Sequence, residues 1–393
     1  MPDGLKLPIY LDHQATTPVD PRVVEAMLPY FTEVFGNPAS TRHTFGRDAH
    51  AAVETSREVL GRALNAKPQD VCFTSGATES LNLAIKGSYL ANRRRQQHYI
   101  TVCTEHKAVL DSFRWIEAEG ALVTYLPVDK NGMLDPGQVA NAIKPETVMV
   151  SVMAANNEIG VIQPLQKIGA ICRSRGIVFM TDATQALGKI PLDVEEMSVD
   201  LLACSAHKVY GPKGIGALYC RRSAPRVDLT PIIDGGGHER GLRSGTLNVP
   251  GIVGFAKAVD LATREMRREG TRLKALRGSL VEALRNLIPE VTLNGALEPR
   301  LPGNLNIRIA GVESQALIIA LADSIAVSTG SACTSSAVEP SHVLKALGLA
   351  DQEVRCSIRF GLGRTTTSDQ IEFAARAVAD EATRLRMLVR TAG

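Results

Sequence analysis

The sequence predicts an α/β protein with a large domain on a mostly parallel central sheet and a smaller α+β domain. The chain has 393 residues, which at ~150 residues per domain fits two to three domains, or one large α/β unit with an appendage. Hydrophobic residues make up 45% and charged residues 22%, which is typical of a globular protein with a large core. Continuous apolar runs alternate with stretches at helical spacing, the pattern of βαβ units whose strands are covered on both faces.

Four of the apolar runs end in polar residues that can carry chemistry. They span residues 71–73, 147–153, 176–180 and 200–204. The first is followed by Thr-Ser-Gly-Ala-Thr-Glu-Ser at 74–80, and the others end near Asn157, Asp182 and Lys208. Because ligands bind beyond the carboxyl ends of parallel strands, we expect these residues to meet in one pocket.

The last third of the chain predicts a second, smaller domain. From Val259 to Leu287 apolar residues recur at helical spacing among many charges, which indicates a long surface helix. Thr367 and Gln370 form a possible capping box at the start of a C-terminal helix. We place the large domain at residues 18–265, and the small domain at 266–393 together with the N-terminal residues 1–17.

Composition excludes several classes of function. A net charge of +3 and 4% aromatic residues do not favour nucleic-acid binding, and the three arginines at 93–95 are expected to form a solvated face. No apolar segment reaches the ~18 residues of a membrane-spanning helix, and the first residues do not resemble a signal peptide. The seven cysteines are scattered without a Cys-x-x-Cys pair, so we expect a reducing, cytoplasmic location. Cys103 and His106 alone are too few ligands for an intrinsic metal site.

The residues of the expected pocket suit an anionic ring with an aldehyde. Residues 74–78 offer hydroxyls and backbone N–H groups for a phosphate, Lys208 offers an amine for an imine bond, and Asp182 can hold a pyridine nitrogen protonated. Each of these features also has a structural interpretation without a cofactor. Residues 74–78 could form a polar turn, Lys208 could be a surface amine, and Asp182 could be a helix N-cap.

The combination resembles pyridoxal 5'-phosphate enzymes of the aminotransferase-like fold (fold type I). In detail it is similar to the cysteine desulfurases of the iron–sulfur-cluster-assembly branch over nearly the whole chain. His13 and Gln14 differ from residues that are often Asn in that family. The motifs that carry the resemblance lie at 10–18 (Tyr-Leu-Asp-His-Gln-Ala-Thr-Thr-Pro), 74–80, 104–107 (Thr-Glu-His-Lys), 156–160 (Asn-Asn-Glu-Ile-Gly), 205–208 (Ser-Ala-His-Lys), 243–246 (Arg-Ser-Gly-Thr) and 331–335 (Ser-Ala-Cys-Thr-Ser).

The resemblance implies a role for each residue that faces the cofactor ring. Lys208 would form the imine, Asp182 would pair with the pyridine nitrogen, and His106 would stack on the ring and shuttle protons. Gln185 would contact the ring hydroxyl, as would the neighbourhood of Asn157, which would also face the substrate.

The phosphate contacts implied by the resemblance come from two subunits. Ala77, Thr78, Ser205 and His207 would hold the phosphate from one chain. Thr246 would reach it from the other, which implies a homodimer with shared sites.

Nine small residues at 328–336, Ser-Thr-Gly-Ser-Ala-Cys-Thr-Ser-Ser, predict an exposed loop that carries one thiol, because such residues cannot pack a core. By resemblance Cys333 is the nucleophile that takes up sulfur as a persulfide, whereas the other six cysteines fill the core. The length of the loop matches the assembly branch. It implies transfer of sulfur to an iron–sulfur scaffold protein or a tRNA-thiolation carrier, with Cys333 a transient ligand of a shared cluster.

The activity implied is removal of sulfur from L-cysteine with release of L-alanine. Arg359 would bind the substrate carboxylate, and its alternative is a surface ion pair. Lys208 and His106 would move the α-proton. Two other classes stay open: another lyase or transaminase on the same fold, such as a selenocysteine-specific enzyme, and a non-enzymatic platform that only binds partners.

Overall fold

A seven-stranded sheet forms the centre of the larger part of the molecule. The computed structural model describes residues 5–92, 96–223, 226–329 and 340–391, with only the backbone of 389–391. The strand order is β2-β8-β7-β6-β5-β3-β4. Both β2 and β7 pair antiparallel with β8, whereas the other pairs are parallel. The strands are β2 (Val71–Thr74), β3 (His98–Val102), β4 (Leu122–Leu126), β5 (Thr147–Ser151), β6 (Val178–Asp182), β7 (Leu201–Ser205) and β8 (Gly216–Cys220).

Because β8 alone among these seven strands is reversed, the carboxyl ends of β2, β5, β6 and β7 lie at one edge, as the sequence predicts. Strand β6 begins two residues later than the apolar run because Gly176 adopts a left-handed conformation, with φ of 66°, just after a helix ends. Polar side chains that follow these four strands therefore share one side of the sheet.

Helices cover both faces of this sheet, as continuous apolar strands require. One buried cluster includes residues of α3 (Thr44–Leu64), α6 (Pro136–Ala142), α7 (Leu165–Ser174) and the first part of α8 (Val249–Leu287). A second cluster packs α4 (Ala77–Ala91) and α5 (Lys107–Ala118) on the opposite face.

A separate core surrounds a three-stranded antiparallel sheet of order β12-β10-β9. Strand β1 in the N-terminal segment pairs with β11 and brings Ile9 and Leu11 into this core. Its elements are β1 (Ile9–Tyr10), β9 (Val291–Leu293), β10 (Asn304–Ile309), α9 (Ser314–Leu321), β11 (Ile325–Ala326), β12 (Ser357–Gly361) and α12 (Ser368–Thr391). The remaining elements are α1 (Pro21–Met27), α2 (Pro29–Thr32), η1 (Pro68–Asp70), η2 (Ala206–Lys208), η3 (Glu239–Gly241), α10 (His342–Ala346) and α11 (Asp351–Arg355).

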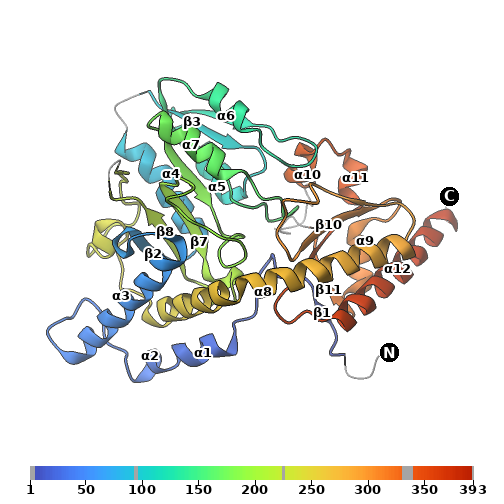
Figure 1. Cartoon of the computed structure of the whole chain (residues 1–393), viewed down its shortest axis with the longest axis horizontal. Helices are drawn as coiled ribbons and strands as arrows, with labels where there is room; N and C mark the ends of the chain where they lie inside the picture. Colours follow the sequence, from blue (N-terminus) through green and yellow to red (C-terminus); the bar gives the residue numbers. More distant parts are fainter. Residues whose placement is uncertain (1–4, 93–95, 224–225, 330–339, 392–393) are drawn as a thin grey trace.

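Helix α8 runs through both cores as one helix of 39 residues (Figure 1). Its residues up to Ala262 join the core of the large sheet, and those from Leu273 join the core of the small sheet. The predicted domain boundary at 265 falls inside this helix, and the division itself stays a prediction. None of the described helices combines the length and apolar character needed to cross a bilayer.

The capping box predicted before α12 is confirmed. The backbone N–H of Thr367 donates to Gln370 Oε1 (3.1 Å), and the N–H of Gln370 donates to Thr367 Oγ1 (3.3 Å). These bonds satisfy backbone groups that the first turn leaves without a helical partner.

Candidate active site

Lys208 lies just after β7, at the end of the short 3₁₀ helix η2. Its Nζ donates hydrogen bonds to the backbone carbonyls of Gln14 and Ala15, at 2.6 Å each. Burial, together with the positive charge of Arg359, lowers the pKa of Lys208 to about 8. Roughly a tenth of this amine is therefore neutral at pH 7, which is the form that can attack an aldehyde.

Asp182 and His106 lie beside this amine. Asp182 ends β6 and is buried, and its Oδ1 accepts from the N–H of Thr184 at 2.9 Å within a turn rather than a helix. His106 caps α5, and its Nδ1 accepts from the N–H of Ala108 at 3.1 Å. Desolvation by the surrounding protein lowers the pKa of His106, although part of the residue is exposed. The negative charge of Asp182 raises this pKa, and the positive charge of Lys208 lowers it further. The three groups thus lie within electrostatic reach of one another, and neutral His106 carries its proton on Nε2.

Gln185 follows Asp182 and is also buried. Its Nε2 donates to the carbonyl of Gln14 at 2.9 Å, and that oxygen also accepts from Lys208. One backbone carbonyl therefore holds the lysine amine and the glutamine amide side by side.

The predicted phosphate residues gather around the start of α4. Gly76 precedes this helix with φ of 156°. Gly216 at the start of β8 packs closely against it, because a Cβ added at Gly216 would lie 2.6 Å from the Cα of Gly76. A Cβ on Gly76 would lie 3.8 Å from Ser205 Oγ. The end of β7, the start of β8 and the N-terminus of α4 therefore converge, with Ala77 and Thr78 in the first turn. The backbone N–H groups of a helix N-terminus attract anions.

His207 and Thr246 complete the predicted phosphate set in different ways. The Nδ1 of His207 lies 3.0 Å from Thr16 Oγ1, and burial lowers the pKa of this histidine to about 4. Thr246 is exposed, in a loop tied to α4 by the ion pair between Arg243 and Glu79 (2.8 Å). Its predicted role across a subunit interface stays a prediction.

Arg359 lies on β12 and is buried. Its guanidinium lies 2.8 Å from Asp12 Oδ1 and donates to the backbone carbonyl of Asn157 at 2.8 Å. Ser328 Oγ donates to the same Asp12 oxygen at 3.1 Å. The ion pair considered as an alternative therefore exists, but its guanidinium is buried within electrostatic reach of Lys208 rather than lying at the surface.

Cys333 lies outside the described residues. The other six cysteines carry free thiols, and five of them are buried, whereas Cys103 is half-buried. Burial raises the pKa of the thiols of Cys72, Cys103, Cys172, Cys204 and Cys220. A raised pKa makes a thiol a poor nucleophile at neutral pH.

The structure adds residues for which the sequence predicts no role. Asp12, Gln14 and Thr16 come from the N-terminal segment, and the motif at 10–18 is the only signal of them in the sequence. Glu105 is fully buried, its Oε1 accepts from the N–H of Met153 at 2.5 Å, and burial raises its pKa well above the usual range. Lys189 donates to Gln185 Oε1 at 3.1 Å.

Comparison with protein families identifies the family of this chain. The aminotransferase class-V family model matches residues 9–373. The chain belongs to this family. The cysteine desulfurase IscS of Anaeromyxobacter dehalogenans (strain 2CP-C) is 53% identical over 382 residues, which cover 97% of this chain and 94% of the relative.

Solved structures agree with this assignment. A NifS-like protein superposes with a TM-score of 0.90 at 35% identity and covers 96% of this chain and 100% of its own. SspA in complex with cysteine superposes with a TM-score of 0.79 at 36% identity and covers 90% and 98%. These comparisons confirm the predicted family membership, the α/β fold and the use of pyridoxal phosphate. They also confirm the prediction that the chain is a cysteine desulfurase.

Proposed function

We propose that this class-V protein removes sulfur from L-cysteine and releases L-alanine, with Lys208 and Asp182 holding the cofactor and Cys333 carrying the sulfur away. The observation that carries the proposal is the shared carbonyl of Gln14. It sets the Lys208 amine beside the Gln185 amide, as neighbouring aldehyde and hydroxyl groups on one ring require, while Asp182 lies on the adjacent strand.

Pyridoxal phosphate supplies an aldehyde that captures amines and a protonated ring that withdraws electrons from the substrate carbon. The described residues fit this group. The first turn of α4, with Ala77 and Thr78, would hold the phosphate together with Ser205 and His207. Asp182, at the end of β6, would supply the negative charge that a protonated ring nitrogen needs, and Asn157, whose carbonyl accepts from Arg359, would face the substrate.

Proton transfer is assigned to Lys208 and His106. The lowered pKa of each gives it a neutral fraction at neutral pH, so each can accept a proton from carbon and return it. Such a transfer typically contributes ~10²–10⁴-fold to the rate.

Substrate orientation is assigned to Arg359. A guanidinium binds a carboxylate through two parallel hydrogen bonds. Asp12 and the carbonyl of Asn157 restrict its position before substrate arrives, which lowers the entropy lost on binding.

The sulfur step is assigned to Cys333. Its thiolate attacks the sulfur of the bound cysteine and forms an S–S bond, while the C–S bond breaks. The electron pair of the broken bond stays on carbon, which takes up a proton and becomes the methyl group of L-alanine. The raised pKa of five described thiols, those of Cys72, Cys103, Cys172, Cys204 and Cys220, supports this assignment, because it leaves them protonated.

A homodimer is part of the proposal. Phe31, Phe35 and Phe45 are 59%, 61% and 53% exposed, which is unusual for aromatic residues on a monomer surface and typical of an interface. Thr246 is exposed as well and is thus available to a second subunit. We further propose a cytoplasmic location, consistent with the free thiols, and an iron–sulfur scaffold or a tRNA-thiolation carrier as the sulfur acceptor.

The main experiment incubates the purified yellow protein with L-cysteine, measures alanine and locates the persulfide by mass spectrometry. Cys333→Ser is expected to keep the cofactor absorbance and lose both persulfide and alanine formation. Cys103→Ser is the matched control, and it is expected to keep both. A persulfide on Cys103, or unchanged sulfur release by Cys333→Ser, contradicts the sulfur step.

Subunit sharing is tested with mixed dimers of Lys208→Ala and Thr246→Ala chains. If Thr246 acts across the interface, a mixed dimer contains one complete site and recovers the parent affinity for pyridoxal phosphate there. If Thr246 acts within its own chain, no complete site forms and the parent affinity does not return.

A further inference from the structure

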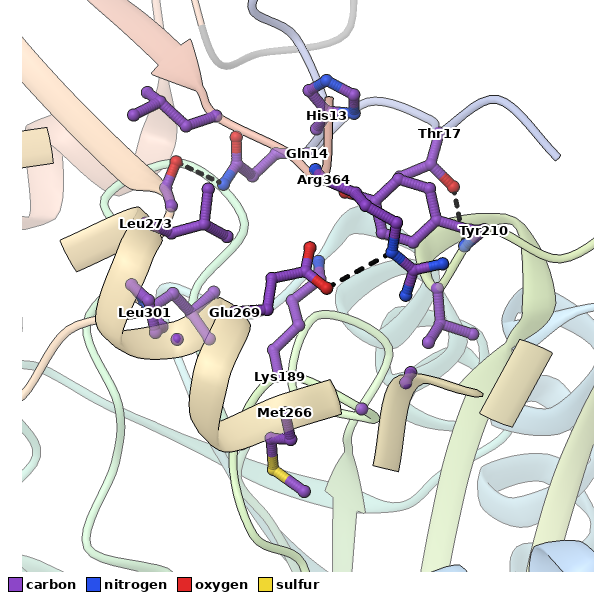
Figure 2. Close-up of a pocket in the computed structure, with 17 residues that line it drawn as sticks. His13, Gln14, Thr17, Lys189, Tyr210, Met266, Glu269, Leu273, Leu301 and Arg364 are labelled. Carbon is purple, nitrogen blue, oxygen red and sulfur yellow. Dashed lines mark hydrogen bonds and ion pairs between the residues drawn. The ribbon is translucent and has the colours of Figure 1, made fainter. Parts of the chain in front are cut away.

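Lys189 is a half-buried residue whose amine is desolvated by the surrounding protein, and the reaction described above does not use it. It lines a small cavity of about 40 Å³ between α8 and the N-terminal segment (Figure 2). Figure 2 shows the end of its long side chain beside the carboxylate of Glu269, whose charge acts on this amine. Burying an amine is costly, so its presence there needs a reason.

The Lys189 amine makes a hydrogen bond that leads to the cofactor site. Its Nζ donates to Gln185 Oε1 at 3.1 Å, and Gln185 Nε2 donates to the carbonyl of Gln14 at 2.9 Å. Lys208 Nζ donates to that same carbonyl at 2.6 Å. A chain of three hydrogen bonds therefore joins Lys189 to the amine that carries the cofactor.

This chain allows one orientation of the Gln185 amide. The carbonyl of Gln14 only accepts hydrogen bonds, so it requires the NH₂ group of the amide. Lys189 only donates while it is protonated, and in that form, about half of the population at pH 7, it requires the amide oxygen. The reversed amide would set two oxygens together at Gln14 and two donors together at Lys189. Both ends therefore favour the same arrangement, which leaves one N–H of Gln185 unused by these two bonds.

We propose that Lys189 is a positioning residue that fixes the Gln185 amide, so that Gln185 presents an N–H donor to the ring oxygen of the cofactor. The inference rests on the proposed contact between Gln185 and that oxygen. A ring oxygen next to an imine carries negative charge, which a donor stabilises and an amide oxygen would repel.

The surroundings of Lys189 are consistent with this role. Burial and the charge of Lys208 lower the pKa of Lys189 to about 7, and Glu269 opposes the shift. The ring nitrogens of His13 are buried and make no hydrogen bond to the described residues. The charged and titratable groups that face Lys189 or share its cavity are His13, His207, Lys208, Tyr210, Glu269, Arg359 and Arg364.

The test follows the visible absorption of the bound cofactor as a function of pH. A donor on the ring oxygen favours the unprotonated imine, so losing the donor raises the pH midpoint of the absorption change. We expect Lys189→Met to raise this midpoint by about one pH unit, the size of a hydrogen bond to a charged group. Lysine-to-methionine keeps the length and the apolar stem of the side chain, so the variant should fold.

A double-mutant cycle separates positioning from charge, because removing a nearby positive charge also raises the midpoint. Gln185→Ala is expected to raise the midpoint as well. When Lys189→Met is added to the Gln185→Ala variant, we expect a further rise that is less than half of the rise that Lys189→Met causes in the parent protein. An equal effect in both backgrounds shows that Lys189 acts through its charge and overturns the inference. An unchanged midpoint in Lys189→Met overturns it too.

The proposed function fails in a different way. If the parent protein forms no yellow chromophore that borohydride fixes on Lys208, the cofactor assignment is wrong. If the parent forms it and the cycle shows no coupling between Lys189 and Gln185, only the positioning role is wrong.

Discussion

Replacing Glu239 with glutamine removes the negative partner of an ion pair that is buried on both sides. The side chains of Arg57 and Glu239 are 3% and 1% exposed, and two hydrogen bonds of 2.8 Å join them. Glu239 Oε2 also accepts from the backbone N–H of Phe73 at 2.7 Å. Glu239 thereby holds the loop that leads to Thr246 against β2, directly before the predicted phosphate loop.

The expected loss of stability follows from the charge that is left behind. Removing one partner of a buried pair costs about 3–5 kcal/mol. Arg57 keeps a second carboxylate, Glu54, at 3.1 Å, which is 40% exposed, so we expect the lower end, about 3 kcal/mol. With about 2.1 cal/mol/K of unfolding entropy per residue over 393 residues, this lowers the melting temperature by about 4 °C.

The assay is calorimetry of the holoenzyme at one scan rate, with Glu195→Gln as the matched control. Glu195 also pairs with a buried arginine, Arg221, but it is 54% exposed, and Asp200 lies 2.9 Å from that arginine. We expect the control to change the melting temperature by less than about 1 °C. The double variant Arg57→Met/Glu239→Gln should recover part of the loss, because no uncompensated charge remains. If Glu239→Gln melts no lower than Glu195→Gln, the buried pair does not stabilise the fold as argued.

Two further predictions concern the cofactor site. Burial and the charge of Arg359 lower the pKa of Lys208 to about 8, whereas Asp182 and Asp12 raise it. Arg359→Gln should therefore move the pH midpoint of pyridoxal phosphate incorporation above about 8, and Asp12→Asn should move this midpoint below about 8. Stopped-flow absorbance measures both midpoints. Gly216→Ala would place a Cβ 2.6 Å from the Cα of Gly76. We therefore expect this variant to bind pyridoxal phosphate about tenfold more weakly. Binding of pyridoxal, which lacks the phosphate, should change little, and equilibrium titration measures both affinities.

Each of these has an outcome that contradicts it. Midpoints that move in the same direction in Arg359→Gln and Asp12→Asn would show that the two charges do not act on Lys208 as opposed neighbours. Gly278→Ala is the control for Gly216→Ala, because nothing lies within 4 Å of a Cβ added there. Equal losses of affinity for pyridoxal phosphate and pyridoxal would place the disturbance away from the phosphate end.

The local pattern of the sequence was sufficient for four of the seven strands of the large sheet, β2, β5, β6 and β7, and for the residues that follow them, but not for β3, β4 and the reversed β8. A buried parallel strand must be apolar along its length, so its end is visible where polar residues begin, and parallel strands end at one edge. This is why Asp182 and Lys208 were predicted to lie together. The capping box at Thr367 was visible for the same reason, since both of its hydrogen bonds span three residues.

The partners of these residues depended on the tertiary structure. Lys208 is held by a carbonyl 194 positions away, and Arg359 pairs with Asp12 across 347 positions. Such contacts arise only after the two cores pack along α8 and the N-terminal segment crosses between them, and no local period in the sequence encodes that packing. A backbone carbonyl such as that of Gln14 also has no side-chain identity to read. Sequence alone therefore determined which groups can react, and the packing of distant segments decided what orients them and sets their charge.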